Sequence, residues 1–473
     1  MLKVCRAAEP LVGALSVAFT RRTFQRVVVL IVGAILSPRR RTVTAALQAA
    51  GPLAKGHWSD FHRVLCRRVW SNWVLGRVLA AMVLELVPAG RPVVVPVDDN
   101  AVQHNGPRVW GKGKHLDPLR STRRWRVWLW GHKWVVLAVN VKFPFASRPW
   151  ALPVLCALYR TKDLNRKERR PHKKPIKLAV QLVAALIHWF PDRRFILLGD
   201  GGFASHGLAK FCWRHRRHVT LVSRFHPAAA LYDAPPPRTP KGTGKGKAKA
   251  KGKAKAKAKG KAKGGRPRVR GERRPSPRQV VANTPAKKRR RCTVTWYGGK
   301  TRRVELVTGT GRWYKAGGGL AVPVRWVFVH DREGTHRDEY FYCTDSSLSA
   351  RDVVGLYTGR WSIEVTFQEV RAHLGFTTVR NWCARSVQRT APCLLGLFSL
   401  VCLTFERHAR GRAVKPLGTA WYAKTEATFA DAVTTVRRLC WAEFFRQPPW
   451  EAGANKLPRR LRLLLLDQLS RAA

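Results

Sequence analysis

Four residues of one predicted helix, within residues 356–376, have the types and the spacing that chemistry on a phosphate group needs. Tyr357, Arg360, Glu364 and Arg371 lie at offsets of 0, 3, 7 and 14 residues, which at about 100° per residue place them in a stripe of roughly 60°. One carboxylate would then lie among two guanidiniums and a phenol, a combination that suits a site for both a metal ion and phosphates. The apolar residues of the adjacent stripe are expected to face the core: Ile363, Phe367, Val370 and Leu374.

Two aspartates stand where buried strands are expected to end. Asp98 follows the apolar run Pro92–Val97, and Asp200 comes just after Phe195–Leu198. Open α/β sheets place their functional sites at the carboxyl ends of strands. Together with Glu364, these carboxylates could hold two Mg²⁺ ions, with Mn²⁺ as a substitute, because Mg²⁺ prefers hard oxygen ligands. Two such ions about 3.5–4 Å apart stabilise the attacking and leaving oxygens of an in-line phosphoryl displacement.

Other interpretations of the acidic and polar residues remain open from the sequence. An aspartate after a strand is often a helix cap or a turn former. Residues 199–204, with the sequence GDGGFA, match a loose dinucleotide-binding pattern, although no acid follows at the expected distance of about 20 residues. His115, Asp117 and His132 could form a separate metal site, but ordinary polar contacts are the favoured interpretation.

The charge of the chain indicates that its partner is a polyanion. Lys and Arg number 90 against 27 Asp and Glu, and the formal net charge is +63. Residues 238–291 hold 23 Lys or Arg and one acid, Glu272, so this tract carries +22 and leaves +41 on the rest of the chain. Both parts are basic, which favours nucleic acid. A membrane is not an expected partner, since the longest apolar run, Val27–Leu36, is about half of the ~20 residues that a spanning helix needs.

The predicted elements place the chain in the α/β class and divide it into five parts. These are a helical, DNA-binding region (1–90), the first part of a mixed-sheet core (91–224), a β-rich insertion (225–345), the second part of the core with the Glu364 helix (346–385), and a C-terminal helical region (386–473). The insertion contains a Lys-rich tract, 235–291, which cannot bury apolar surface and is expected to be disordered.

Hydrophobic periodicity and turn residues predict the individual elements. Helices are expected at 42–50, 61–87, 176–190, 206–217, 386–408, 429–445 and 457–470, and the first two are compatible with a helix-turn-helix. Strands are expected at 92–97, 125–130, 134–141, 195–198, 219–223, 293–296, 304–307, 324–330 and 340–343. The glycine at 131 is taken to mark a turn between the second and third of these strands.

The spacing of the helical residues resembles a known family signature. Tyr357-x2-Arg360-x3-Glu364-x6-Arg371 is similar to the Y-(2)-R-(3)-E-(6)-K signature of cut-and-paste insertion-sequence transposases of the DDE superfamily. The resemblance implies that Glu364 is catalytic and that Tyr357, Arg360 and Arg371 bind phosphates near a transposon end. Arg371 departs from the signature, because it keeps the positive charge of lysine but changes the geometry of the donors.

The two aspartate segments carry the same resemblance. Asp98-Asp99-Asn100 is similar to the first motif of that group, Asp-x-Thr, and GDGGFAS, which contains Asp200, is similar to the second. The resemblance implies an RNase H-like catalytic core, interrupted by a β-rich insertion, with Asp98, Asp200 and Glu364 as the catalytic, metal-binding triad. Asp98 and Asp99 compete for the first position because neighbouring strand residues face opposite ways, and the order of the motif favours Asp98.

The sequence therefore predicts a bacterial transposase that cleaves and joins DNA with Mg²⁺. The expected partners are double-stranded DNA, at the terminal inverted repeats and at the target, and a second copy of the chain in a synaptic complex. The expected location is the cytoplasm, in association with the nucleoid. Two alternatives remain: an RNase H-like nuclease or inactive domesticated relative, and a non-catalytic basic architectural DNA-binding protein.

Overall fold

The computed structural model describes residues 4–38, 41–117, 120–236, 268–414, 416–418, 423–446, 451, 453 and 456–471. The α-helices are α1 (Glu9–Ala14), α2 (Arg21–Leu36), α3 (Val43–Ala50), α4 (Trp58–Cys66), α5 (Asn72–Leu84), α6 (Lys162–Lys167), α7 (Pro175–Trp189), α8 (His206–Arg214), α9 (Pro277–Ala282), α10 (Ala350–Gly359), α11 (Ser362–His373), α12 (Ala384–Ala409), α13 (Phe429–Phe444) and α15 (Arg459–Arg471). The strands are β1 (Val93–Gln103), β2 (Gly113–Leu116), β3 (Trp128–Val141), β4 (Trp150–Tyr159), β5 (Phe195–Gly199), β6 (Val219–Arg224), β7 (Leu231–Tyr232), β8 (Arg290–Thr295), β9 (Thr301–Trp313), β10 (Val322–Asp331) and β11 (Glu339–Cys343).

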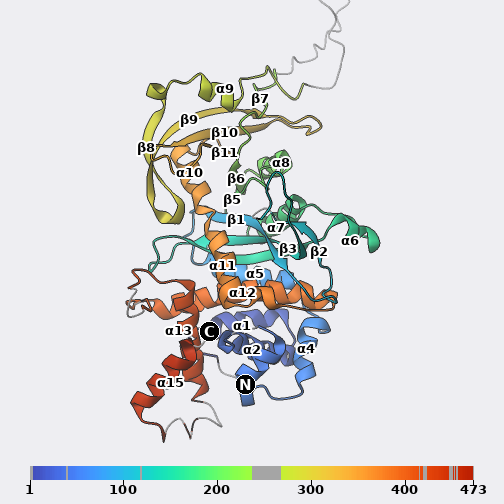
Figure 1. Ribbon diagram of the computed structural model, residues 1–473, viewed down its shortest axis with the longest axis vertical. Helices are drawn as coiled ribbons and strands as arrows, with labels where there is room; N and C mark the ends of the chain where they lie inside the picture. The colour runs from blue at the N-terminus through green and yellow to red at the C-terminus, as the bar shows by residue number, and fades with distance from the viewer. Residues whose placement is uncertain are drawn as a thin grey trace, which may run out of the picture.

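Five strands form the RNase H-like centre that the sequence predicts. They lie in the order β4-β3-β1-β5-β6, as part of an 11-stranded sheet in the described residues. β1 pairs antiparallel with β3 and parallel with β5, and β5 pairs parallel with β6. The chain reaches β5 from β4 through α6 and α7, and α8 connects β5 to its parallel neighbour β6, as a crossover connection does. The predicted fold class, a mixed α/β core with helical regions at both ends, is confirmed (Figure 1).

Strand β1 is longer than the predicted run and contains both candidate aspartates. Pro96 is tolerated in this central strand because the pairing with β3 begins after it, at Val97. Beyond Val97 the strand continues along β3 to Gln103. Asp98 and Asp99 are therefore strand residues that point to opposite faces of the sheet.

The prediction of a turn at residues 131–133 is wrong, since β3 runs without a break through this segment. A Cβ atom at Gly131 would lie 1.8 Å from the carbonyl oxygen of Val102, so the glycine permits close approach to β1. The hairpin partner of the first part of β3 is β2, and the partner of the second part is β4. Neither β2 nor β4 was predicted from the sequence.

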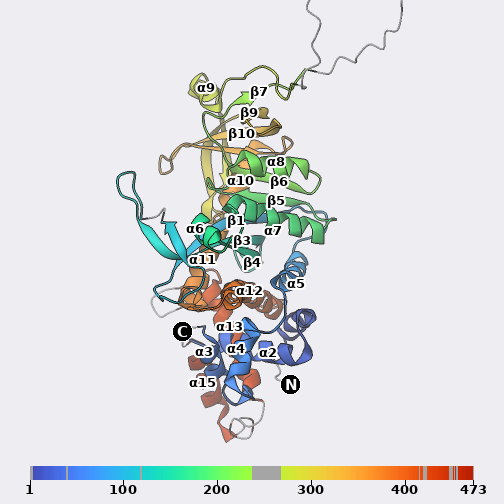
Figure 2. The same ribbon diagram turned by 90° about the vertical axis from the view of Figure 1, so that its right-hand side faces the viewer.

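Helices cover both faces of the sheet. α10 packs on one face, where Val353, Val354 and Tyr357 meet Leu198 of β5 in one apolar cluster. α7 and α8 pack on the opposite face, in the main core, together with strand residues such as Leu197, which is the neighbour of Leu198 and points the other way. α12 lies between the sheet and the helices α1 to α4, as Figures 1 and 2 show together, while α5 packs on β4.

Among the described helices, α12 is long and apolar enough to cross a membrane by length and composition. Its most apolar window is 78% buried inside the protein, however. It packs against β4, α5 and α13, so it has the surroundings of a core helix.

The β-rich insertion continues the same sheet. β11 pairs with β6, and β10, β9 and β8 follow in order. Most of the tract predicted to be disordered lies outside the described residues, but its last part is ordered. α9 begins at Pro277 with a capping box between Ser276 and Gln279, and Val281 is buried. The prediction of disorder is therefore wrong for residues 268–291, where a capped helix and the start of β8 replace the low-complexity pattern.

The N-terminal region differs from its prediction in one respect. The segment 61–87 forms two helices, α4 and α5, because Trp70 turns inward and donates a hydrogen bond from Nε1 to the carbonyl of Val64 over 2.6 Å. α3 is close to its expected range. The role of this region in DNA binding stays a prediction.

Candidate active site

Strands β1 and β5 bring the two predicted catalytic aspartates together. Val97 pairs with Gly199 in the parallel register, so Asp98 and Asp200 are the next residues along the two neighbouring strands. Adjacent strands lie about 4.8 Å apart, and residues in register point to the same face. That face is the one covered by α10, because Leu198, two residues before Asp200, packs in the same apolar cluster as Tyr357.

The helix that was predicted to carry the whole signature is broken into α10 and α11. Arg360 and Trp361 form a tight turn between them, in which Arg360 N bonds to Tyr357 O and Trp361 N bonds to Thr358 O. Asn140 of β3 supports this turn by donating to the carbonyl of Gly359 over 3.0 Å and accepting from the hydroxyl of Ser362 over 2.7 Å. The assumption of one continuous helix is thus wrong, because a side chain from a distant strand replaces part of the helical hydrogen bonding.

The guanidinium of Arg360 bridges two of the predicted catalytic acids. Nη1 donates to Oδ2 of Asp98 over 2.9 Å, and Nη2 donates to Oε1 of Glu364 over 2.6 Å. The Arg360 side chain is 9% exposed and that of Asp98 is 15% exposed, whereas that of Glu364 is 44% exposed. Charge-assisted hydrogen bonds of this length are among the stronger ones in proteins. The site therefore contains a cation that lies between two carboxylates.

The ion pair with Arg360 does not fully offset the cost of burying the charged carboxylate of Asp98. Its burial raises the pKa of the carboxyl to about 7, and the nearby charge of Asp200 acts in the same direction, while Arg360 opposes both. The same ion pairs raise the pKa of Arg360 further above its usual range. A further cation near Asp98 would therefore stabilise the charged form of this buried carboxyl.

Asp200 shapes the loop that follows β5. Its Oδ1 accepts hydrogen bonds from the backbone N–H groups of Gly202 (2.9 Å) and Phe203 (3.2 Å). These are the N–H groups that a pyrophosphate would need in the loose dinucleotide pattern of residues 199–204. The turn-forming interpretation of Asp200 holds in this respect, and its second oxygen, Oδ2, takes no part in the two bonds.

Asp99 lies on the other face of β1. Its carboxylate forms an ion pair with Lys133 of β3, with 2.9 Å between Oδ1 and Nζ. Lys133 was not singled out in the sequence, although it is the one Lys or Arg within the apolar stretch that became β3. Of the two neighbouring aspartates, Asp98 is the one that faces Arg360.

Tyr357 is buried rather than presented at the surface. The residue is 1% exposed, and its ring stacks on that of Phe341 with 4.1 Å between centroids. Arg360 and Arg224 lie 5.7 and 6.0 Å from the ring centroid, within cation–π range. Arg224 in turn forms an ion pair with Glu339. Sequence reasoning missed Arg224 and Glu339, which come from distant strands.

Arg371 and Asn100 meet at the far end of the site. Nη1 of Arg371 donates to Oδ1 of Asn100 over 3.2 Å, while the residue itself stays exposed to solvent. The Nδ2 group of Asn100 is buried and has no hydrogen-bond partner in the described part of the chain. Asn100 lies two residues beyond Asp98 on the same face of β1, so Arg371 extends the row of basic groups along the acids.

The donor set fits divalent cations, although the side chains do not form a closed metal site as they stand. Three carboxylates supply hard oxygen ligands of the kind that Mg²⁺ prefers, and Arg360 occupies the gap between two of them as a stand-in cation. Within the described ranges, no group of three or more His, Cys, Asp or Glu side chains lies close enough to hold a metal ion. Glu364 would have to exchange Arg360 for a shared cation.

The alternative metal site at residues 115–132 is not assembled. His132 bonds to the carbonyl of Trp110 over 2.8 Å, and Asp117 pairs with Arg120 over 2.8 Å. The ring of His132 contacts that of His104, with 4.5 Å between centroids. These are the ordinary polar contacts that the sequence favours.

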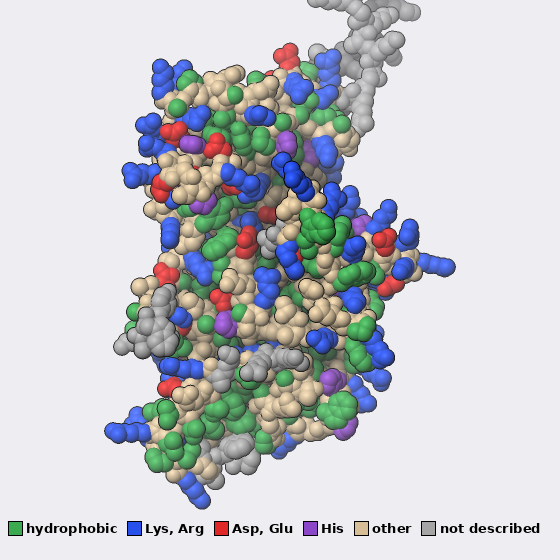
Figure 3. All heavy atoms as spheres, in the orientation of Figure 1, with side chains coloured by type: hydrophobic (Ala, Val, Ile, Leu, Met, Phe, Trp, Pro, Cys, Tyr) green, Lys and Arg blue, Asp and Glu red, His purple; other side chains and the backbone are tan. Residues whose placement is uncertain are grey.

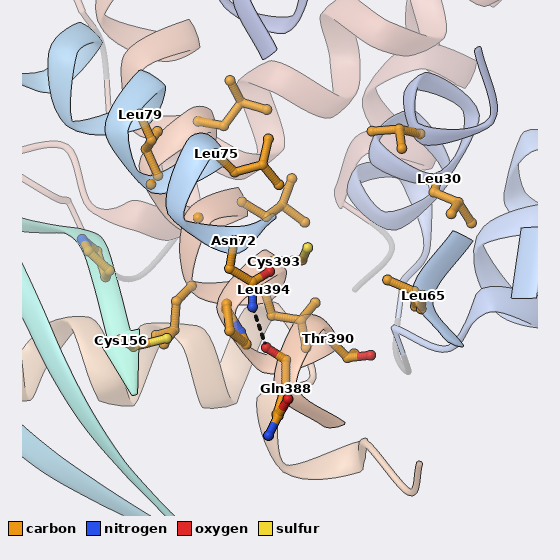
Figure 4. Close-up of a pocket in the computed structure, with 18 of the residues that line it drawn as sticks. Leu30, Leu65, Asn72, Leu75, Leu79, Cys156, Gln388, Thr390, Cys393 and Leu394 are labelled. Carbon is orange, nitrogen blue, oxygen red and sulfur yellow. Dashed lines mark hydrogen bonds between the residues drawn. The ribbon is translucent and has the colours of Figure 1, made fainter. Parts of the chain in front are cut away.

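An apolar cavity lies away from the acids. It has a volume of about 380 Å³ and lies between the N-terminal helices, β4 and α12. In Figure 4, Asn72 donates to the carbonyl of Gln388 over 2.7 Å beside Cys156 and Cys393. None of the predicted site residues lines this cavity.

Basic side chains are distributed over the whole of the visible face. Figure 3 shows Lys and Arg spread from the β-rich insertion to the C-terminal helices, with few acidic groups between them. This agrees with a charge of +63, most of which lies outside the Lys-rich tract. A basic surface of this extent attracts polyanions.

Comparisons with known proteins give one family. A family described as DDE superfamily endonuclease matches residues 14–303, which is more than half of the chain. The match includes Asp98 and Asp200 and ends before Glu364. No curated protein matches the chain. Among solved structures, the chain is similar to the piggyBac transposase in a cryo-EM synaptic complex with hairpin DNA, with a TM-score of 0.37 and 9% identity over 98% of this chain and 81% of that one.

Proposed function

Because the chain belongs to the DDE superfamily endonucleases, we propose that it is a transposase that cuts and joins DNA at the ends of an insertion sequence. The observation that carries the proposal is the arrangement of Asp98, Asp200 and Glu364. Asp98 and Asp200 lie side by side at the ends of the paired segments of two parallel strands. Glu364 is linked to Asp98 through Arg360.

In this proposal Asp98, Asp200 and Glu364 hold two Mg²⁺ ions, for which Mn²⁺ substitutes. Bound in this way, the ions would activate water and stabilise the charge that develops on the attacking and leaving oxygens. Water attacks the phosphorus at the element's end, the P–O3′ bond breaks, and the 3′-oxygen leaves as a hydroxyl. The oxygen of that hydroxyl then attacks a phosphodiester of the target, a new P–O bond forms, the target's own P–O3′ bond breaks, and its 3′-oxygen leaves as a hydroxyl with the proton that the attacking group loses. In this proposal both attacking oxygens come from water or DNA, and the protein forms no bond to DNA.

Arg360 has two possible anionic partners, the carboxylates and a DNA phosphate. In the absence of other cations it neutralises Asp98 and Glu364. Once these carboxylates bind divalent ions, we propose that the guanidinium turns to a phosphate of the bound end, where it forms bidentate hydrogen bonds. Arg371 is exposed and reaches a phosphate directly. The hydroxyl of Tyr357 is buried and has to become accessible when DNA binds, while its ring also supports Arg360.

The remaining features of the proposal concern partners and location. The N-terminal region and the basic surface would bind double-stranded DNA at the inverted repeats and at the target. Pairing of two ends calls for at least two copies of the chain in the synaptic complex. A bacterial cytoplasm, with the chain on the nucleoid, is the setting that we propose.

Cleavage of a labelled DNA end with and without Mg²⁺ tests this function, with the end sequence taken from inverted repeats that flank the gene. Asp200→Asn and Glu364→Gln should abolish metal-dependent cleavage and largely retain DNA binding. Glu369→Gln is the matched control, because Glu369 lies on the same helix as Glu364 but pairs with His373. Equal cleavage by all of these variants would refute the assignment. Binding without cleavage by the native chain would instead identify an inactive relative or an architectural protein.

A further inference from the structure

The hairpin formed by β2 and β3 exposes three tryptophans that the proposed chemistry does not use. Trp125, Trp128 and Trp130 are 72%, 46% and 55% exposed. Figure 2 shows this cyan hairpin projecting from the body of the protein. Single exposed apolar residues are common on proteins, but a row of large aromatic rings is not, and such surfaces mark binding sites.

The strand register gathers these rings on one face. Lys114 pairs with Trp130 and Leu116 pairs with Trp128, so the four side chains stand on the same side of the two-stranded ribbon. All four are exposed, whereas Leu129 on the opposite side is 7% exposed. The ammonium of Lys114 lies 5.0 Å from the ring centroid of Trp128, within cation–π range.

Hydrogen bonds join the described residues 121–127 at the tip of the hairpin. The backbone N–H of Thr122 donates to the carbonyl of Trp125 over 2.7 Å, and the N–H of Trp125 donates to the hydroxyl of Thr122 over 3.0 Å. Ser121 accepts through its hydroxyl from the N–H of Val127 over 3.0 Å. Trp125 is thus presented on an ordered turn, which lowers the entropy that a partner must remove.

The charge of the hairpin selects the class of partner. Residues 112–130 contain six Lys or Arg and one acid, Asp117, which already pairs with Arg120 over 2.8 Å. Basic groups interleaved with exposed aromatic rings are the surface that binds single-stranded nucleic acid, since phosphates meet the charges and bases stack on the rings. The bases of an intact duplex cover each other's faces, so the rings need bases that are unpaired.

The position of the hairpin relates it to the acids. Asp98 pairs with Val136 of β3, and even-numbered residues of β3 share its face, so Trp128 and Trp130 point to the same side of the ribbon as Asp98. Trp130 lies six residues from Val136 along β3, a distance of about 20 Å at ~3.3 Å per residue. DNA rises about 3.4 Å per step, so this distance corresponds to about six nucleotides.

We propose that the exposed face of this hairpin, made by Lys114, Trp128 and Trp130 with Trp125 at the tip, binds unpaired bases of DNA about six nucleotides from the phosphodiester that is cut. This inference rests on the proposed function for the identity of the polymer. It adds the site on the chain and the state of the DNA that the site selects. The rings hold the DNA end open, so they act in positioning and take no part in the bond changes.

Binding of two labelled duplexes of equal length tests the inference. One duplex is fully paired, and the other has about six mismatched, splayed positions at one end. The native chain should bind the splayed duplex more tightly, and the double variant Trp128→Ala/Trp130→Ala should lose about ten-fold or more of that preference, the order that stacking of one base contributes. Trp128→Phe/Trp130→Phe keeps aromatic rings and should retain most of the preference.

Trp213→Ala is the matched control for the tryptophan pair. Trp213 also lies beside a basic group, with Arg216 at 4.9 Å from its ring, but it belongs to α8 on the other face of the sheet. The inference is overturned if the native chain binds both duplexes equally, if the alanine pair keeps the preference, or if Trp213→Ala loses it equally.

Cleavage assayed in the same preparations separates this inference from the proposed function. A tryptophan-dependent preference for splayed DNA without metal-dependent cleavage would support the hairpin site and refute the transposase. Metal-dependent cleavage by the native chain without a preference for splayed DNA would support the transposase and refute the hairpin site.

Discussion

Arg360 donates a hydrogen bond from Nη1 to Oδ2 of Asp98 over 2.9 Å, although the two residues are 262 positions apart in the chain. The same guanidinium reaches Glu364 through Nη2. Without a divalent cation, two of the three predicted catalytic acids, Asp98 and Glu364, are therefore joined by an internal cation. Divalent cations and Arg360 would therefore compete for the carboxylates of Asp98 and Glu364.

Substitution of Arg360 by Ala should weaken binding to an element's end and reduce its dependence on salt. A phosphate contact contributes about 0.9 to the slope of log affinity against log salt concentration, so the slope should fall by roughly that amount. Titration of labelled DNA at several salt concentrations measures both quantities. Arg166→Ala serves as the control, since its side chain is 80% exposed on α6 and pairs with Asp163. An unchanged slope for Arg360→Ala would argue against a phosphate contact.

Asp98→Asn should change how stability depends on pH in the absence of divalent cations. Burial raises the pKa of Asp98 from 3.8 to about 7, so between these values the unfolded chain has lost a proton that the folded chain retains. The native chain is therefore destabilised as pH rises from about 4 to 7, and asparagine has no proton to lose. In EDTA, the melting temperature of the variant relative to the native chain should be higher at pH 8 than at pH 5. A difference that stays constant with pH would contradict the environment assigned to Asp98.

Asn140→Leu should destabilise the turn between α10 and α11. The substitution removes the two hydrogen bonds of Asn140, to the Gly359 carbonyl and from the Ser362 hydroxyl, and leaves those two groups only their mutual bond of 2.9 Å. Each lost bond contributes about 0.5–1.5 kcal/mol. Urea unfolding measures the loss. In a double-mutant cycle with Ser362→Ala, the two effects should not add, because both variants remove the same contact. Additive effects would show that Asn140 acts elsewhere.

Tyr357 is predicted to act both as support and as a phosphate ligand, and two substitutions separate these roles. Tyr357→Ala removes a ring stacked on Phe341 in the core and should cost about 3–5 kcal/mol of stability. Tyr357→Phe keeps the ring and removes the hydroxyl. If the hydroxyl binds a phosphate, the Phe variant should bind DNA ends more weakly with an unchanged salt slope, because no charge is lost. Native affinity in the Phe variant would leave Tyr357 with the supporting role alone.

The central strands and the positions of their aspartates could be predicted from local patterns. Apolar runs that end in Asp98 and Asp200 are typical of buried strands, and the fold places both residues in register. The buried stripe of α11 was also correct, since Ile363 and Val370 are fully buried. These features depend on residues close to each other in the sequence, which is why periodicity detects them.

The features that were missed depend on contacts between distant segments. The break after Gly359 requires Asn140 from β3, a polar residue within an apolar strand that was the available signal. Glycine is common in turns, but Gly131 lies within a strand, where the absence of a side chain lets β3 approach β1 closely. This role depends on Val102, which is distant in the sequence and lies beside Gly131 only in the folded chain. The ion pairs of Arg360 were hidden for the same reason, because periodicity places an arginine on a helix face without identifying its partner.

A structure of the chain with Mn²⁺ and a DNA end tests the central claim most directly, because the anomalous signal locates the metal without reference to activity. We expect Mn²⁺ between the carboxylates of Asp98, Asp200 and Glu364, with the Arg360 guanidinium moved from Asp98 to a phosphate. Mn²⁺ bound elsewhere, with Arg360 still between Asp98 and Glu364, would contradict the account.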